Sequence, residues 1–398
     1  MDFKIFSLNC WGIPIISKDR NARFKAISEA LSTSAYDVVC LQEVWAESDF
    51  ILIKEKVETS LRYSHYFYSG VIGSGICVFS KYPILDVFFH QWTVNGYVHK
   101  IQHADWFGGK GIGFCKLLVD GFNINIYSAH LHAEYNRLND EYQCHRVQQA
   151  YDTAQFIQQT SGLADLIVLA GDLNTEPEDL AYRIIVHLTG LKDSFLEVKE
   201  DSKEIHKIGT NESFYNSYAD KKAIRSGDAG KRIDYIMYGC PKNPNIKITT
   251  KKYCQPLPRR VPEKSFSYSD HEAITATLQI EKGLDEIEEL DRDTCTAILE
   301  ECILISDTAL RNLRTKRFGY WILTCLLFLI LVSSTPFNAP DGYNYLVHFG
   351  RLLVTLLMAY LFFMGSLWYK MEFHGILAGK LAMEVGLNRF KDNRMKNF

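Results

Sequence analysis

Residues 166–174 read Leu-Ile-Val-Leu-Ala-Gly-Asp-Leu-Asn. The short apolar run at 166–170 predicts a buried strand. Asp172 and Asn174 follow it two residues apart, and on an extended backbone this spacing turns both side chains to one face. Such a pair can hold a phosphate group, an attacking water or a hard metal ion. Asp and Asn also form turns after strands, so the motif alone leaves a structural and a functional interpretation open.

Similar short strands alternate with helical segments from Met1 to about Ile280. We expect strands at residues 4–8, 37–41, 75–79, 113–119, 122–128, 166–170, 232–238 and 273–280, and helices at 20–31, 48–61, 141–159 and 177–188. Many strands with helices between them predict an α/β (α+β) fold of four layers, in which helices flank a core of two sheets.

Polar groups also stand at the ends of other expected strands. Glu43 follows the apolar run at 38–42, and a carboxylate there is a natural Mg²⁺ ligand. Asn9 leaves a strand at a turn. Asp270 and His271 precede the last strand, and a histidine beside a carboxylate can serve as a general base. A structural histidine would fit the same position.

Taken in chain order, the polar strand ends form a recognisable series: Asn9, Glu43, His130, Asp172, Asn174, Asp270 and His271. This series resembles the endonuclease/exonuclease/phosphatase superfamily over roughly residues 1–280. The resemblance implies a deoxyribonuclease-I-like β-sandwich flanked by helices, and a metal-dependent attack of water on a phosphorus ester. It also implies that His130 binds the phosphoryl group and that Asp234 orients the first histidine or the phosphate. From the residues alone, Asp234 could instead pair with Arg232 on an edge strand.

Five stretches resemble neutral sphingomyelinases more specifically: residues 9–14, 43–45, 73–81, 105–110 and 130–136. The family resemblance implies hydrolysis of sphingomyelin to ceramide and phosphocholine. It also implies that Asp105 and Lys110 act as a switch on the geometry of the active site, with Lys110 approaching the phosphate. The residues alone allow either a Gly-Gly-Lys turn that moves or a plain surface turn.

The mechanism that we expect uses a metal ion and a general base. Glu43, supported by Asn9, is expected to hold Mg²⁺, with Mn²⁺ as an alternative ion. His271, held by Asp270, is expected to take a proton from water. The groups expected to position water and phosphoryl oxygens are His130, Asp172 and Asn174.

Three rival interpretations stay open at this stage. A phospholipase C acting on lyso-choline phospholipids would meet the same headgroup and phosphodiester. A catalytically silent membrane scaffold would use the fold for binding alone, and it predicts gaps in the series of polar residues. A zinc site at His130 and His132 is disfavoured, because the sequence shows no third soft ligand for it.

The chain changes character after residue 281. We expect a catalytic domain at 1–281, a juxtamembrane linker helix at 282–317, two transmembrane helices with a short hairpin at 318–369, and a tail at 370–398. Residues 318–337 and 352–369 carry no charge, and each run is about as long as a bilayer is thick. The hairpin at 338–351 contains Pro340, Gly342 and a single basic residue, Arg351. A buried helical hairpin of a soluble protein is the alternative interpretation.

Charge and cysteine content indicate the cellular setting. Basic residues cluster before the first span and after the second, so the positive-inside rule places the catalytic domain and the tail in the cytosol. The expected membranes are the endoplasmic reticulum, another endomembrane or the inner leaflet of the plasma membrane. Ten cysteines without a Cys-x-x-Cys pair indicate free thiols in a reducing compartment.

Net charge bears on the partners. A formal net charge of -3 disfavours a nucleic-acid partner, since proteins that grip the phosphate backbone usually carry a basic field. The expected partners are therefore sphingomyelin and the lipid bilayer. Activation by anionic lipids and the oligomeric state are left open by the sequence.

Overall fold

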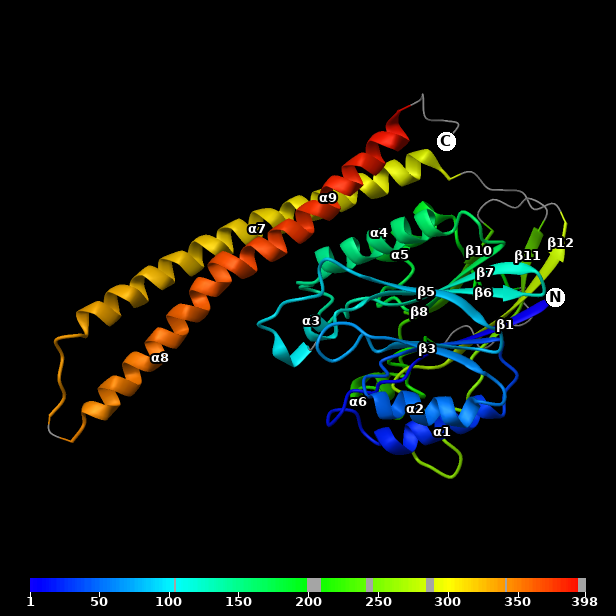
Figure 1. Cartoon of the computed structure of the whole chain (residues 1–398), viewed down its shortest axis with the longest axis horizontal. Coiled ribbons are helices and arrows are strands. Elements are labelled where there is room, and N and C mark those ends of the chain that lie inside the picture. The colour runs from blue at the N-terminus through cyan, green and yellow to red at the C-terminus, as the bar shows by residue number, and fades with distance from the viewer. Residues whose placement is uncertain (104, 199–208, 241–245, 284–289, 341, 393–398) are drawn as a thin grey trace. The chain divides into compact units, whose positions relative to one another are not determined.

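Two six-stranded β-sheets face each other in the first of the two units into which the chain divides, Met1–Ile298 and Leu299–Phe398 (Figure 1). The computed structural model describes every residue except 104, 199–208, 241–245, 284–289, 341 and 393–398. The first sheet contains, in spatial order, β11 (Ile246–Cys254), β12 (Ile274–Lys282), β1 (Asp2–Asn9), β2 (Val38–Gln42), β4 (Ile76–Ser80) and β3 (Tyr63–Phe67). The second contains β5 (Ile84–Gln91), β6 (Gly111–Val119), β7 (Phe122–His130), β8 (Leu166–Asp172), β10 (Asp234–Gly239) and β9 (Lys192–Asp193).

Successive side chains along each strand point to opposite faces of the sheet, and this alternation produces the layers. In β1, Phe3 and Ile5 point into the core between the sheets, where they belong to one cluster with Ile126 and Val168 of the second sheet. Helices α1 (Arg20–Ser32) and α2 (Glu47–Val57) cover the other face of the first sheet. Helices α4 (Gln143–Thr160) and α5 (Leu180–Thr189) lie over the second sheet (Figure 1). The predicted four-layer sandwich is confirmed.

Each sheet has a parallel pair of strands near its centre, and this pairing sets the position of the polar strand ends. β1 runs parallel to β2, with Asn9 beside Gln42, and β7 runs parallel to β8, with His130 beside Asp172. β12 is antiparallel to β1 and β10 is antiparallel to β8, so both begin at the edge where the parallel strands end. One edge of the sandwich therefore collects the polar groups of six strands.

The strands that the sequence analysis did not predict are β3, β5, β9 and β11. All four are the outer strands of their sheets. An edge strand buries fewer of its side chains, so it lacks the apolar run that marks an interior strand. Two short helices, α3 (Asp105–Gly108) and α6 (Lys221–Ser226), were missed as well.

The C-terminal unit consists of long helices. α7 (Arg292–Ser333) runs without a break through the end of the expected linker helix and into the expected first span, 318–337, but it ends four residues before that span was expected to end. Residues 284–289 of that expected linker lie outside the described residues, and its first residue, Lys282, ends β12. α7 is followed by α8 (Asn344–Phe363), a π-helical turn (Met364–Trp368) and α9 (Tyr369–Lys391). An ion pair joins α9 to α7, with Lys380 Nζ 2.8 Å from Asp307 Oδ1.

The hairpin between the two spans is shorter than predicted. α8 begins at Asn344, so Arg351 lies inside a helix and not in the turn. Its guanidinium donates to the backbone oxygens of Ser334, Thr335 and Phe337, just beyond the end of α7. These carbonyls lie beyond the end of α7, so they can accept hydrogen bonds from the guanidinium of Arg351. The accepted hydrogen bonds allow a charged side chain within the apolar helix α8.

Two helical stretches are long and apolar enough to cross a membrane, Arg292–Ser333 and Asn344–Lys391. Within the most apolar stretch of each, only 6% of the residues are buried. The core helix of a soluble protein would be covered by other side chains. Exposed apolar helices of this length indicate association with a bilayer.

A first prediction concerns Gly171 of β8, which is paired with Ala129 of β7. Its φ is +151°, and a Cβ atom there would lie 2.0 Å from the Ala129 backbone oxygen. We expect Gly171→Ala to lower the free energy of unfolding by about 2 to 4 kcal/mol through backbone strain and steric overlap. Thermal or denaturant unfolding of the purified protein checks this. Gly162→Ala is the control, because a Cβ there meets nothing within 4 Å; equal stability of the two variants would contradict the prediction.

Candidate active site

The polar strand ends leave their sheets through strained backbone. Trp11, Glu43 and Asn174 have φ values of +46°, +56° and +45°, and each lies one or two residues beyond β1, β2 or β8. The left-handed region costs residues other than glycine roughly 1 to 2 kcal/mol each. Strain that recurs at three neighbouring strand ends is typical of a functional site, where the surrounding structure holds a side chain in a set direction.

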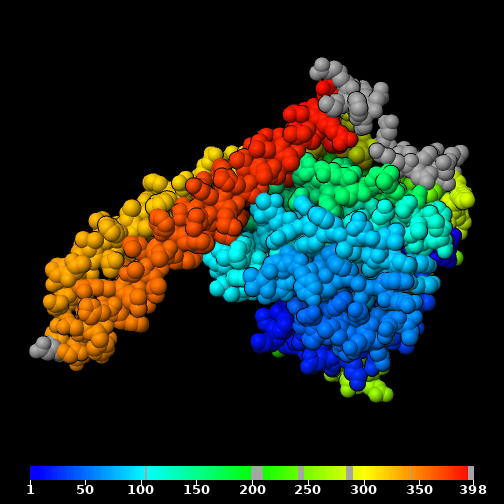
Figure 2. All heavy atoms as spheres, viewed as in Figure 1, coloured from blue at the N-terminus to red at the C-terminus, as the bar shows by residue number. Residues whose placement is uncertain are grey.

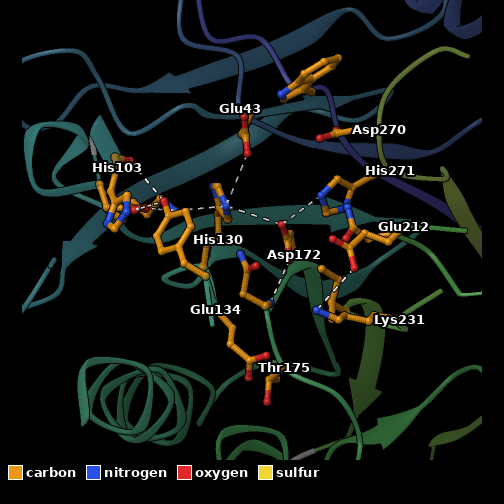
Figure 3. A pocket seen from close by; sticks show the side chains of 18 of the residues that line it. Glu43, His103, His130, Glu134, Asp172, Thr175, Glu212, Lys231, Asp270 and His271 are labelled. Atoms are coloured by element: carbon orange, nitrogen blue, oxygen red, sulfur yellow. Dashed lines mark hydrogen bonds and ion pairs between the residues drawn. The ribbon is translucent and has the colours of Figure 1, made fainter. Parts of the chain in front are cut away.

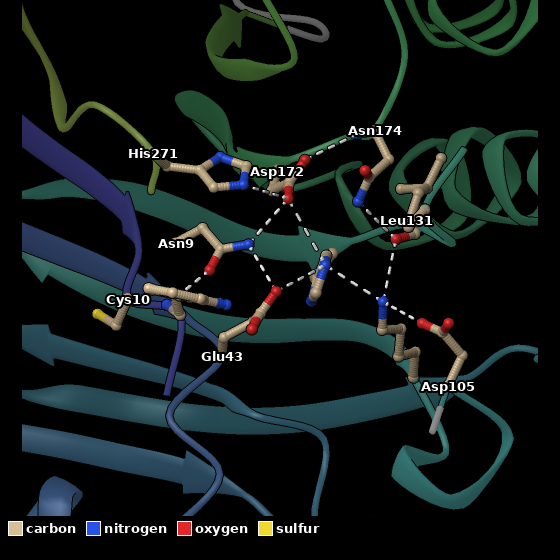
Figure 4. A network of polar contacts seen from close by, with 12 residues as sticks. Asn9, Cys10, Glu43, Asp105, Leu131, Asp172, Asn174 and His271 are labelled. Atoms are coloured by element: carbon tan, nitrogen blue, oxygen red, sulfur yellow. Dashed lines mark hydrogen bonds and ion pairs between the residues drawn. The ribbon is translucent and has the colours of Figure 1, made fainter. Parts of the chain in front are cut away.

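Asn9 links the two sheets (Figure 4). Its side-chain Nδ2 donates to Glu43 Oε1 at 3.0 Å and to Asp172 Oδ2 at 2.9 Å. Its Oδ1 accepts from the backbone N–H of Trp11 at 2.9 Å. The amide oxygen of Asn9 is thus engaged by Trp11, and the amide nitrogen supports the carboxylate of Glu43. The part predicted for Asn9 in holding Mg²⁺ together with Glu43 stays a prediction.

His130 lies beside a buried lysine. Lys110 Nζ is 3.2 Å from His130 Nε2, and it also contacts Asp105 Oδ1 at 2.6 Å. An ammonium group can only donate, so Nε2 accepts and the ring proton resides on Nδ1. Burial, helped by the charge of Lys110, holds the pKa of His130 well below its ordinary value, so the ring is neutral.

Asp105 is buried as well, which by itself would raise the pKa of its carboxyl. The ammonium of Lys110 outweighs that effect and holds the pKa of Asp105 below its usual range. The hydroxyl of Tyr135 donates to Asp105 Oδ2 at 2.8 Å. Tyr135 was not predicted as a site residue, although it lies in the stretch 130–136 that resembles the neutral sphingomyelinases.

Asp172 lies at the centre of the cluster. Its Oδ2 is 3.6 Å from His130 Nε2 and 3.8 Å from His271 Nε2, and its Oδ1 accepts from the backbone N–H of Asn174 at 2.9 Å. Asn174 is therefore both a turn former and a site residue, and its Nδ2 donates to the Leu131 backbone oxygen at 3.0 Å. Burial and the neighbouring charge of Asp234 raise the pKa of Asp172.

His271 takes its carboxylate partner from another strand. Its Nδ1 lies 2.8 Å from Asp234 Oδ2, at the start of β10, whereas Asp270 is not its hydrogen-bond partner. The predicted pairing with Asp270 is wrong, because Asp234 occupies Nδ1 of His271, while Asp270 Oδ1 accepts from the Ser269 hydroxyl at 3.2 Å. Asp234 likewise does not pair with Arg232, which contacts Asp193 Oδ2 at 2.6 Å. Burial opposes a charge on His271, but Asp234 and Asp172 raise its pKa well above the ordinary value.

A buried arginine on α1 supports two of these strand ends. The Arg23 guanidinium donates to the backbone oxygens of Cys10 and Trp11 at 2.7 Å each and to that of Tyr268 at 3.2 Å. It therefore joins the segment after Asn9 to the segment before Asp270. These hydrogen bonds all go to backbone carbonyls, and a backbone acceptor leaves no pattern in the sequence, so Arg23 could not be predicted from sequence.

These groups surround a cavity of about 690 Å³ (Figure 3). Eight of the ten predicted site residues line it: Glu43, Asp105, Lys110, His130, Asp172, Asn174, Asp270 and His271. Asn9 and Asp234 do not line it, but they hold three of its side chains: Glu43 and Asp172 by Asn9, and His271 by Asp234. His132 is not among the lining residues: it is buried, its ring stacks on Tyr142 at 3.9 Å between ring centroids, and its Nε2 lies 3.4 Å from Asp105 Oδ2.

Two groups of residues have the chemistry to hold a divalent cation. Asp172, Asp234 and His271 place ligand atoms within 4.8 Å of one another, but their hydrogen bonds already engage most of these atoms. Glu43 and Asp270 face the same part of the cavity (Figure 3), and burial and the charge of Glu43 raise the pKa of Asp270 to about 6. Two carboxylates that repel each other fit a hard cation between them.

Known proteins resemble this chain along most of its length. Residues 6–271 match the Endonuclease/Exonuclease/phosphatase family. A Drosophila melanogaster protein whose name includes "neutral sphingomyelinase" is 40% identical over 98% of this chain and 97% of its own. Sphingomyelin phosphodiesterase 2 of Rattus norvegicus is 38% identical over 83% and 79% of the two chains. Inositol phosphosphingolipids phospholipase C of Schizosaccharomyces pombe is 28% identical over 94% and 92%.

A solved structure agrees with the fold. The crystal structure of SmcL covers 70% of this chain and 99% of its own, with a TM-score of 0.51 and 19% sequence identity. The two proteins therefore share the two-sheet sandwich of the N-terminal unit.

A second prediction follows from the Glu43 and Asp270 pair. The pKa of Asp270 is about 6 in the folded protein and about 3.9 in an unfolded chain, so its ionisation destabilises the fold above pH 6 and not below pH 4. In EDTA, Asp270→Asn should therefore raise the free energy of unfolding by about 2 to 3 kcal/mol at pH 8, with the gain vanishing towards pH 4. Added Mg²⁺ should stabilise the wild-type protein more than the variant.

Thermal unfolding followed by intrinsic fluorescence, across pH and with or without Mg²⁺, measures both effects. Glu55→Gln on the exposed face of α2 is the control for loss of a carboxylate away from the cavity, and its unfolding temperature should stay close to that of wild type. A variant that is less stable than wild type at every pH would show that Asp270 stabilises the site without a metal.

Proposed function

The chain belongs to the endonuclease/exonuclease/phosphatase family, within its neutral sphingomyelinase branch, and we propose that it hydrolyses sphingomyelin to ceramide and phosphocholine with the aid of Mg²⁺. It is a phosphodiester hydrolase, and its animal and fungal relatives are named for sphingolipid substrates. One observation carries the proposal. Two buried histidines of opposite character, a neutral His130 and a strongly basic His271, face the same cavity on either side of Asp172.

His271 is the general base of the proposed reaction. Asp234 accepts the Nδ1 proton and leaves Nε2 directed towards the cavity, where it can take a proton from water. As the water oxygen forms its bond to phosphorus, the bond between phosphorus and the ceramide oxygen breaks. The imidazolium that results is stabilised by Asp234 and Asp172, which is the physical meaning of its raised pKa.

Lys110 supplies the fixed positive charge on the opposite side of the cavity. Its ammonium is buried between Asp105 and His130, so solvent screens it little. A phosphoryl oxygen that reaches this side meets a charge already held in place, without reorganisation. The switch expected for Asp105 and Lys110 stays a prediction; here the two side chains form a buried ion pair of 2.6 Å.

The Glu43 and Asp270 carboxylates are the groups that would hold the ion. A Mg²⁺ bound there would act as a Lewis acid on the departing ceramide oxygen, which is a poor leaving group as an alkoxide. Asn9 keeps Glu43 in place by its hydrogen bond of 3.0 Å, and Asn174 and Asp172 remain to orient water and phosphoryl oxygens. The same donors suit Mn²⁺, which also prefers oxygen ligands.

The C-terminal helices support a membrane substrate. A hydrolase tethered to the bilayer meets its lipid at a high effective concentration. The basic residues beside the spans favour a cytosolic catalytic unit, on the endoplasmic reticulum, another endomembrane or the inner leaflet of the plasma membrane. Activation by anionic lipids stays a prediction. The complete set of cavity residues argues against a catalytically silent scaffold.

A third prediction tests the substrate directly. The purified full-length protein should release phosphocholine from sphingomyelin with Mg²⁺ and lose this activity in EDTA. His271→Gln and Glu43→Ala should each lower kcat by about 10² to 10⁴-fold, because each removes a group that acts in the transition state. Lyso-phosphatidylcholine and plasmid DNA, assayed in parallel, are the competing substrates. Faster cleavage of either one, or activity indifferent to EDTA, would overturn the assignment.

A fourth prediction separates Asp234 from Asp270 by the pH dependence of turnover. The base must be neutral to accept a proton, so activity rises with pH through the pKa of His271. Asp234→Asn removes the carboxylate that raises this pKa, so the acid limb of the kcat profile should move to lower pH while the plateau falls about 10²-fold or more. Asp270→Asn should leave the acid limb closer to its wild-type position. The reverse pattern would restore Asp270 as the partner of His271.

A further inference from the structure

The most exposed apolar side chains of the N-terminal unit gather beside the cavity. Among its described residues, five large apolar side chains are at least 70% exposed: Ile15, Val71, Ile101, Leu138 and Leu163. The first four lie within two residues of Pro14, Ile72, His103 and Arg137, which line the cavity. Of these five residues, only Leu163 is distant from the cavity lining, since it lies before β8, at the opposite edge from the site. Single exposed apolar residues are ordinary, but their concentration around one opening is not.

The turn that carries Ile15 is strained so as to expose it. Ile15 has a φ of +71°, a backbone conformation that branched side chains rarely adopt, and its side chain is fully exposed. The backbone N–H of Ser17 donates to the Ile13 oxygen at 3.0 Å and closes the turn. Arg23 fixes both ends of the turn through the backbone oxygens of Trp11 and Lys18, at 2.7 and 2.9 Å. The strained turn leaves the Ile15 side chain in solvent, so the strain is not offset by burial of that side chain. This points to a function for the exposed side chain.

Val71 is held just as firmly on a second loop. The backbone N–H groups of Val71 and Ile72 donate to the Phe107 oxygen at 2.7 and 3.2 Å, which fixes this loop on α3. A Cβ on Gly70 would lie 2.4 Å from the same oxygen, so only glycine permits the approach. In Figure 2 the dark blue segment that contains the Ile15 turn and the cyan segment that contains α3 lie on the same side of the N-terminal unit.

We propose that Ile15, Val71, Ile101 and Leu138 form an apolar rim that contacts the surface of a lipid bilayer. The rim rests on the proposed function in one respect, since the phosphodiester to be cleaved lies at a membrane surface while its lipid tails stay in the bilayer. The cavity opening must then meet that surface, and apolar side chains fixed around the opening are suited to the boundary between headgroups and acyl chains. The N-terminal unit thereby has a membrane contact of its own, in addition to the C-terminal helices.

Ile15→Asn/Val71→Asn in the full-length protein tests the rim through activity. In proteoliposomes that contain sphingomyelin, the turnover rate of the double variant should be about one tenth of the wild-type rate or lower, because two apolar contacts with the bilayer are lost. With a water-soluble short-chain sphingomyelin it should match the wild-type rate. Asn tolerates a positive φ, so the variant should unfold at the wild-type temperature or above it. Leu163→Asn is the matched control and should change neither rate.

Equal loss on both substrates, or no loss on either, would overturn the proposal. The first result would mean that the loops only shape the cavity, and the second that the rim contacts something other than lipid.

A second readout does not depend on hydrolysis. In proteoliposomes with brominated lipids, Val71→Trp should show additional fluorescence that is quenched relative to wild type, whereas the additional fluorescence of Leu163→Trp should not be quenched. Unquenched Val71→Trp would overturn the rim even if sphingomyelin is cleaved. Quenching without hydrolysis of sphingomyelin would uphold the rim and refute the proposed function.

Discussion

The site depends on one amide group. Asn9 ends a strand of the first sheet, and its Nδ2 bridges Glu43 of that sheet to Asp172 of the second. Both carboxylates are acceptors, so the NH₂ group is the one part of the side chain that can satisfy them together. The alternative orientation would place an amide oxygen against two carboxylates and leave the Trp11 N–H without its acceptor. The spacing between the two sheets is thus tied to the spacing between two charged groups of the cavity.

The sequence predicted the interior of the fold and missed its borders, for one physical reason. All eight predicted strands are interior strands, whose apolar runs record burial on both faces, and all four missed strands are edges. The site followed the same rule. Residues at the ends of interior strands, such as Glu43 and Asp172, were found because an apolar run ends abruptly in a polar group. The partnership between His271 and Asp234 was not, because it depends on the positions of β10 and β12 in two different sheets, which local sequence does not encode.

Much of the site is unfavourable for folding. Asp172 and Asp270 are carboxyls whose pKa is raised, so their ionised forms are less stable in the folded protein than in water. The left-handed conformations of Glu43 and Asn174 add backbone strain. The two hydrophobic clusters on either face of the first sheet offset these terms. Such concentration of unfavourable terms at one edge of a well-packed sandwich is expected where preorganisation for a reaction outweighs stability.

The two histidines show how the surroundings, and not the residue type, assign a role. Both rings are buried, and burial alone would lower the pKa of each. His130 has an ammonium as its nearest charged neighbour, which adds to the effect of burial and keeps the ring neutral. His271 has two carboxylates as neighbours, and they outweigh the effect of burial on its pKa. Asp172 lies between the rings at 3.6 and 3.8 Å, so a change in its charge would alter both pKa values together. The division between a proton acceptor and a neutral positioning group is therefore a property of the whole cluster, and the Lys110 and Asp234 side chains decide which histidine takes which part.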